Sequence, residues 1–185
     1  VASIMGLVFP PPQPTLEYLG HERGASTVTV TRGVDYEEGD LLFSYMQYYS
    51  NVNITDEAGW TLINQGLYST YQSFAFSYII ATANTSYTTD NGNRDNVIVV
   101  FRPRNYNTFS VLDQDYGQYN QPAEINMTDT NDSLYMGFAS AVSGSITDVT
   151  VPPFANVVDV TGADGSVKFY WAYLRAEHGN TGLQA

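Results

Sequence analysis

The chain has 185 residues, enough for one domain with a single hydrophobic core. Its 19 acidic and 7 basic residues give a net charge of −12, which argues against binding to nucleic acid or anionic membranes and suits a basic or cation-bridged partner. The absence of cysteine excludes disulfides and thiolate metal ligands, and no apolar run of about 18 residues predicts a membrane-spanning helix.

Residues 1–14 are predicted to form an N-terminal arm, and residues 15–185 a single domain. The arm ends in a proline cluster, which is stiff, extended and unsuited to a sheet interior. It is either a disordered tail or linker, or an arm that docks on a neighbouring subunit. In the second case its apolar contacts would be Ile4, Met5, Leu7, Val8 and Phe9.

Short strand-like runs rich in β-branched and aromatic residues follow, at 26–31, 41–49, 71–82, 96–103, 133–140 and 166–176. Clusters of Gly, Asn and Asp at 88–96 and 161–166 predict turns. No stretch has a capped, 3.6-residue periodicity. The sequence therefore predicts an all-β antiparallel sandwich or barrel.

The chain also contains an internal repeat at an offset of 93 residues. This offset aligns Leu41 with Leu134 and Phe76 with Phe169, while Trp60 aligns with Phe154 after a slip of one residue. In both halves a strand is followed by a turn and a long aromatic strand. Because a jelly roll combines two Greek keys, two related halves favour a jelly-roll-like sandwich.

Four motifs, GDLL at 39–42, AGWT at 58–61, FSYIIATA at 76–83 and VIVVFRP at 97–103, occur in a recognisable order. Together they resemble a jelly-roll-like β-sandwich module of tailed-bacteriophage structural proteins, of the capsid-decoration and tail-fibre type. The resemblance covers about residues 15–176.

The resemblance implies a virion protein, assembled in the host cytoplasm, that decorates or cements the capsid. Its partners would be the major capsid protein or other virion proteins, and it would form a homo-oligomer, most simply a trimer. A tail or fibre module that recognises host carbohydrate is the alternative.

Each motif also has a structural explanation. Gly39 and Asp40 suit a turn that enters a buried strand, and Gly59 suits a tight bend that directs Trp60 into the core. Pro103 is expected to end its strand because it has no N–H to donate.

The sequence favours a protein that is not an enzyme. His21 and His178 lack metal-ligand spacing, and neither a nucleophile elbow nor a phosphate-binding loop occurs. A jelly-roll glycoside hydrolase is a third hypothesis, with its carboxylates drawn from Asp113, Asp115, Asp129 and Asp132. No cofactor is expected. A structural calcium ion is the alternative to hydrated turns at 90–95, 113–117 and 128–132.

Tyrosine is the most distinctive candidate for surface contacts because it combines a rigid apolar ring with a polar tip. The tyrosines expected in or beside loops and strand ends are Tyr45, Tyr48, Tyr49, Tyr68, Tyr71, Tyr106, Tyr116 and Tyr119. The polar, aromatic segment 105–122, which joins the two halves, is the predicted contact loop. Its candidate contact residues are Tyr106, Tyr116 and Tyr119.

Overall fold

The computed structural model describes residues 15–48, 58–69, 72–90, 95–106, 109–111, 114, 133–140, 156–161 and 166–174. These residues form strands and no helix, so the predicted all-β class is confirmed for the described part of the chain. The strands are β1 (Thr15–Gly24), β2 (Thr27–Thr31), β3 (Leu41–Tyr48), β4 (Thr61–Ser69), β5 (Gln72–Ile80), β6 (Ser86–Asp90), β7 (Asn96–Arg104), β8 (Ser133–Ser140), β9 (Asn156–Thr161) and β10 (Ser166–Leu174).

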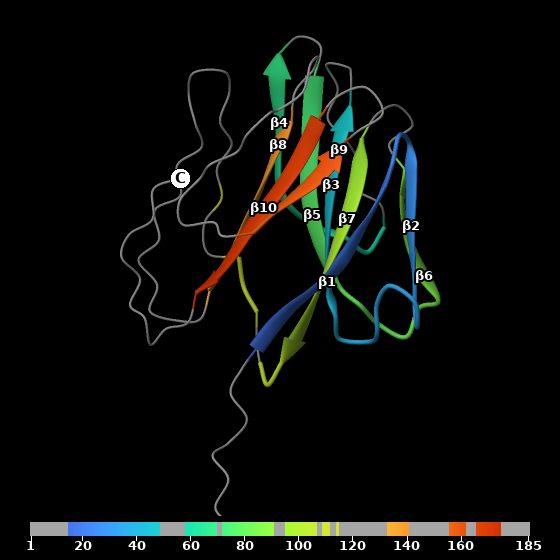
Figure 1. Cartoon of the computed structure of the whole chain (residues 1–185). Coiled ribbons are helices and arrows are strands. Elements are labelled where there is room, and N and C mark those ends of the chain that lie inside the picture. The colour runs from blue at the N-terminus through green and yellow to red at the C-terminus, as the bar shows by residue number, and fades with distance from the viewer. Residues whose placement is uncertain are drawn as a thin grey trace, which may run out of the picture.

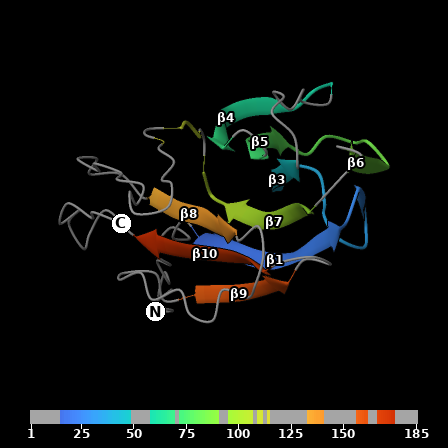
Figure 2. The same cartoon turned by 90° about the horizontal axis from the view of Figure 1, so that it is seen from above.

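The strands form three antiparallel sheets, as Figures 1 and 2 show. The central sheet has the order β1-β7-β3-β5-β4. The sheet β8-β10-β9 packs on one face of it, and the ribbon β2-β6 packs on the other. This arrangement is consistent with a β-sandwich.

Strand β3 lies in the middle of the central sheet and is buried on both faces. Its alternate residues enter different cores: Phe43 faces the sheet β8-β10-β9, and Leu42 faces the ribbon β2-β6. Tyr45 was expected to lie at the surface, and this expectation is wrong. It is only 2% exposed and stacks on Phe138 with ring centroids 4.6 Å apart.

The core between the two larger sheets is largely aromatic. Phe169 of β10 is fully buried and packs at 6.2 Å from Phe101 of β7. Trp171 lies edge-on to Phe101 at 5.3 Å, and Tyr18 of β1 lies 5.7 Å from Trp171. Edge-to-face and tilted pairs of this kind stabilise by about 1 kcal/mol each beyond the burial of their area.

A second core lies under the ribbon β2-β6, where Val30 and Tyr36 are buried against Leu42 and Val100. The predicted bend is confirmed, because Gly59 has φ +97° in the turn before β4. Trp60 then packs edge-on to Tyr87 at 6.2 Å and is partly buried in this core.

The six predicted strands are present as β2, β3, β5, β7, β8 and β10. Four further strands (β1, β4, β6 and β9) were not predicted. The turn predicted at 88–96 is partly wrong, because β6 continues to Asp90. The expectation that Pro103 ends its strand is wrong: the pairing of β7 with β3 stops at Phe101, where β3 begins, but β7 continues beside β1 to Arg104, with Pro103 opposite Leu16.

Two of the ladders share one register. In the β3–β5 ladder Leu41 pairs with Ile80, and in the β8–β10 ladder Leu134 pairs with Tyr173. An offset of 93 residues carries the first pair onto the second, and it does the same along the rest of the described ladder. The strand orders β3-β5-β4 and β8-β10-β9 also correspond.

The burial of Tyr45 predicts a large cost of truncation. Tyr45→Ala should lower the free energy of unfolding by about 3–5 kcal/mol, as is usual for a large ring deleted from a core. Tyr106→Ala, at a partly exposed residue after β7, should cost less than about 1 kcal/mol. Urea denaturation of both variants measures the difference, and equal losses would contradict this assignment of the core.

Candidate functional site

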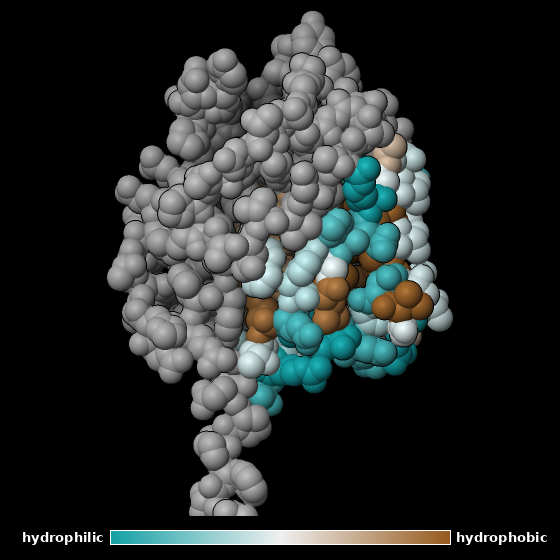
Figure 3. Space-filling model, viewed as in Figure 1, coloured by the Kyte–Doolittle hydropathy of each residue, from teal (hydrophilic) through white to brown (hydrophobic). Residues whose placement is uncertain are grey.

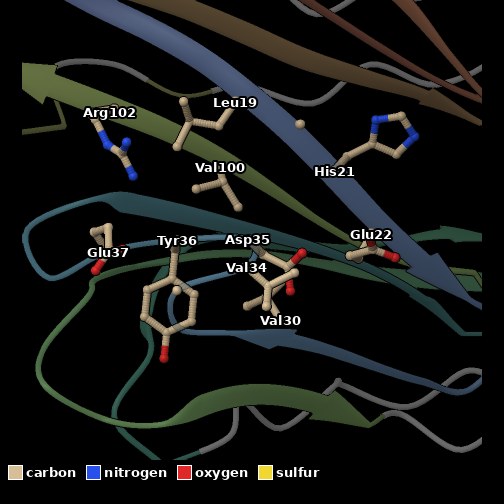
Figure 4. A pocket seen from close by; sticks show the side chains of 12 residues that line it. Leu19, His21, Glu22, Val30, Val34, Asp35, Tyr36, Glu37, Val100 and Arg102 are labelled. Atoms are coloured by element: carbon tan, nitrogen blue, oxygen red, sulfur yellow. The ribbon is translucent and has the colours of Figure 1, made fainter.

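A hollow of ≈ 420 Å³ opens between β1, β2, β7 and the loop that follows β2 (Figure 4). Three apolar residues lie at its base, Leu19, Val30 and Val100, one from each of the three strands. The lining residues are Leu19, Gly20, His21, Glu22, Val30, Gly33, Val34, Asp35, Tyr36, Glu37, Val100 and Arg102.

The rim of the hollow carries an excess of negative charge. Glu22, Asp35 and Glu37 line it against a single cation, Arg102, and Arg102 is already paired with a carboxylate. In Figure 3 hydrophilic residues predominate on the described part of one face, with separate apolar patches between them. An acidic rim suits a cationic group, such as the end of a lysine or arginine side chain.

Arg102 forms a bidentate ion pair with Asp40. Its Nε donates to Oδ1 at 2.9 Å and its Nη2 donates to Oδ2 at 2.7 Å. The Asp40 side chain is 3% exposed and the Arg102 side chain 26% exposed. The hydrogen bonds that Arg102 donates to Asp40 raise the pKa of Arg102 above its already high value. Arg102 is therefore a fixed structural cation and not a proton donor.

Asp40 also holds the backbone around it. Its Oδ2 accepts the N–H of Glu37 at 2.8 Å, and its carbonyl accepts the N–H of Ala81 at 2.8 Å. Gly39, with φ +92°, donates its N–H to the carbonyl of Ala81 at 2.8 Å. One residue thus connects the turn before β3, the end of β5 and, through Arg102, the strand β7.

His21 and Tyr18 form a second polar pair. The Tyr18 hydroxyl lies 2.7 Å from Nδ1 of His21, and burial raises the pKa of Tyr18 to about 12. Burial also lowers the pKa of His21, a change that Glu22 opposes and Arg23 supports. In Figure 4 the His21 ring lies across β1 from Tyr36 and Asp35, so it does not face the rim carboxylates.

The predicted contact residues are only partly placed. Tyr106 follows β7 and Asn105, which has φ 63°, and it is partly exposed. The other predicted contacts lie outside the described residues: Ile4, Met5, Leu7, Val8, Phe9, Tyr116 and Tyr119. The same is true of the four candidate hydrolase carboxylates, of His178, and of most of the candidate calcium loops.

The sequence reading missed Asp40 and Arg102 as partners, although both lie in the quoted motifs. The sequence explains Asp40 as a turn residue and shows Arg102 only as a member of the motif VIVVFRP, so it predicts no contact between them. The two residues are 62 positions apart, so only the pairing of β3 with β7 brings them together. No sequence pattern predicts the hollow, because its lining comes from three strands and a loop.

No protein-family model, curated protein or solved structure matches the chain. Within the described strands and loops, no group of three or more His, Cys, Asp or Glu residues is placed to hold a metal ion. That part of the chain also contains no helix long and apolar enough to cross a membrane.

Breaking the Asp40–Arg102 pair should destabilise the domain. Asp40→Ala removes a buried carboxylate and leaves the partly exposed Arg102 guanidinium and the N–H of Glu37 without their acceptor, so it should lower the free energy of unfolding by about 3 kcal/mol. Arg32→Ala removes exposed ion pairs with Glu37 and Glu38, at 3.9 and 3.7 Å, and an exposed hydrogen bond to the carbonyl of Ala83, and should cost below about 1 kcal/mol. Chemical denaturation compares the two, and a larger loss for Arg32→Ala would contradict the assignment.

The lowered pKa of His21 predicts a pH dependence of stability. Below the ordinary value of 6.5 the unfolded chain takes up a proton more readily than the folded one, so stability should fall as the pH decreases from about 7 towards 5.5. His21→Gln should flatten the dependence in this range. Denaturation midpoints measured against pH test this, together with the NMR titration of the imidazole. A His21 pKa at or above 6.5 would contradict it.

Proposed function

We propose that this protein is a non-catalytic structural protein of a tailed-phage virion that binds the capsid surface as a decoration or cement protein. We further propose that its sandwich is jelly-roll-like and consists of two related halves. The equal registers of the β3–β5 and β8–β10 ladders support the second part. A carbohydrate-binding tail or fibre module is the alternative function.

The observation that carries the proposal is that residues from three of the motifs that resemble phage structural proteins contact one another in the fold. Asp40 of GDLL binds Arg102 of VIVVFRP, and Leu42 of the first motif shares a core with Trp60 of AGWT. Residues that must contact one another to build one core are expected to occur together. The motifs therefore support a common module better than four unrelated short matches would.

The charge of the hollow supports a partner with basic side chains. Glu22 and Glu37 lie on its rim and belong to a chain with a net charge of −12. Such a field accelerates association with a basic surface, and salt weakens it. A capsid protein with exposed lysine or arginine side chains fits this description.

Co-sedimentation with purified capsids or virions tests the proposal. The protein should pellet with them, and binding should weaken as salt increases because exposed charges are screened. Glu22→Gln combined with Glu37→Gln should reduce binding several-fold. Glu38→Gln, in the same loop but outside the lining of the hollow, is the matched control and should bind normally.

Failure to sediment with any capsid, together with binding on a glycan array, would replace the proposal with the carbohydrate-binding alternative. Cleavage of a glycan by the unaltered protein would contradict a non-catalytic role.

A further inference from the structure

Strand β8 has one edge that no described strand occupies. Among the described strands only β10 pairs with it, whereas its counterpart β3 is paired on both sides, with β5 and β7. The β3–β5 and β8–β10 ladders coincide at the offset of 93 residues. The open edge of β8 therefore corresponds to the edge of β3 that β7 fills.

The central sheet has apolar surface beside this edge. Phe138 of β8 lies 4.6 Å from Tyr45 of β3 and 5.5 Å from Phe76 of β5. Phe76 and, on the edge strand β4, Ile63 are only partly buried on this face. A strand added beside β8 would lie over β5 and β4 and would cover both side chains.

The N-terminal segment is similar in sequence to β7, the strand that fills the corresponding edge of β3. Strand β7 contains VVFRP at 99–103, and the arm contains LVFPP at 7–11, so the two share the pattern apolar, Val, Phe, any residue, Pro. In β7 the side chains of Val97, Val99 and Phe101 enter the core. The corresponding residues of the arm are Met5, Leu7 and Phe9.

We propose that residues 4–9 of this chain form the missing strand, antiparallel to β8. Transfer of the β3–β7 register pairs Leu134 with Phe9, Met136 with Leu7, and Phe138 with Met5. It also places Gly6 opposite Gly137. Main-chain hydrogen bonds to an open edge and side chains in alternate pockets are the usual basis of strand addition.

The same chain can supply the strand. In Figures 1 and 2, β1 and β8 begin at the same end of the molecule, so Thr15 and Leu134 lie at that end. The proline-rich residues 10–14 lie between Phe9 and Thr15 and span roughly 19 Å when extended. That is enough to pass between packed sheets, which lie about 10 Å apart. The proposed strand would run from residue 4 to residue 9 towards this end, antiparallel to β8, and the proline-rich residues would then lead into β1.

Engineered disulfides test the pairing, and the natural chain has no cysteine to interfere. Val8→Cys with Tyr135→Cys places two thiols opposite each other in the proposed ladder, within the distance a disulfide spans. Leu7→Cys with Tyr135→Cys is the matched control, because neighbouring residues of a strand point to opposite faces. Thr29→Cys with Thr88→Cys is the positive control, since these residues pair directly in β2–β6.

We expect an intrachain disulfide in the variant with cysteines at positions 8 and 135, and none in the variant with cysteines at positions 7 and 135. Mass spectrometry of the oxidised full chain measures both. Cross-links found only between chains would overturn the assignment to the same chain. The proposed pairing with β8 would be overturned if the disulfide between positions 8 and 135 failed to form while the one between positions 29 and 88 formed. It would also be overturned if positions 7 and 135 cross-linked as readily as positions 8 and 135.

A second measurement needs no cross-link. Leu7→Asp should lower the melting temperature by about 5 °C because its side chain enters the core, whereas Val8→Asp, on the outer face, should leave it nearly unchanged. Equal melting temperatures for the two variants would overturn the proposed register. Capsid binding is not involved in either test, so this inference can fail or succeed independently of the proposed function.

Discussion

The ion pair between Asp40 and Arg102 is the constraint on which the central sheet depends. Burying a carboxylate to 3% exposure is costly unless its charge is matched and its oxygens accept hydrogen bonds. Arg102 supplies two donors and the Glu37 N–H a third. Any shift of β7 along β3 would separate these groups, so the pair helps to fix the register that directs alternate residues into two cores.

The two cores explain the composition of the central strands. A sheet covered on one face alternates apolar and polar residues, but β3 and β7 are covered on both faces and read as nearly continuous apolar runs. Rings that look like surface contacts in the sequence, such as Tyr45, are then interior packing. Within the part of the chain that the structure describes, the acidic hollow and the edges of the sheets are open to a partner.

The hollow and the open edge of β8 are separate places where the domain could bind different groups. The hollow lies under β1 beside the ribbon β2-β6, and the edge of β8 belongs to the sheet on the opposite face. A partner's basic side chain in the hollow and the chain's own arm at the edge of β8 would therefore not compete for the same surface. If the arm joins the sheet β8-β10-β9, β8 becomes an interior strand that is paired on both sides, as β3 is.

Sequence by itself determined the all-β class, six of the strands, the bend at Gly59 and the overall acidity, because period-two patterns, turn residues and charge are local properties. Strands β1, β4, β6 and β9 escaped prediction because their apolar content is low or interrupted, so neighbouring strands decide their conformation. Only the tertiary structure brought Asp40 to Arg102, buried Tyr45 and formed the hollow. Each of these depends on which strands become neighbours, and residues far apart in the chain carry no local signal of that choice.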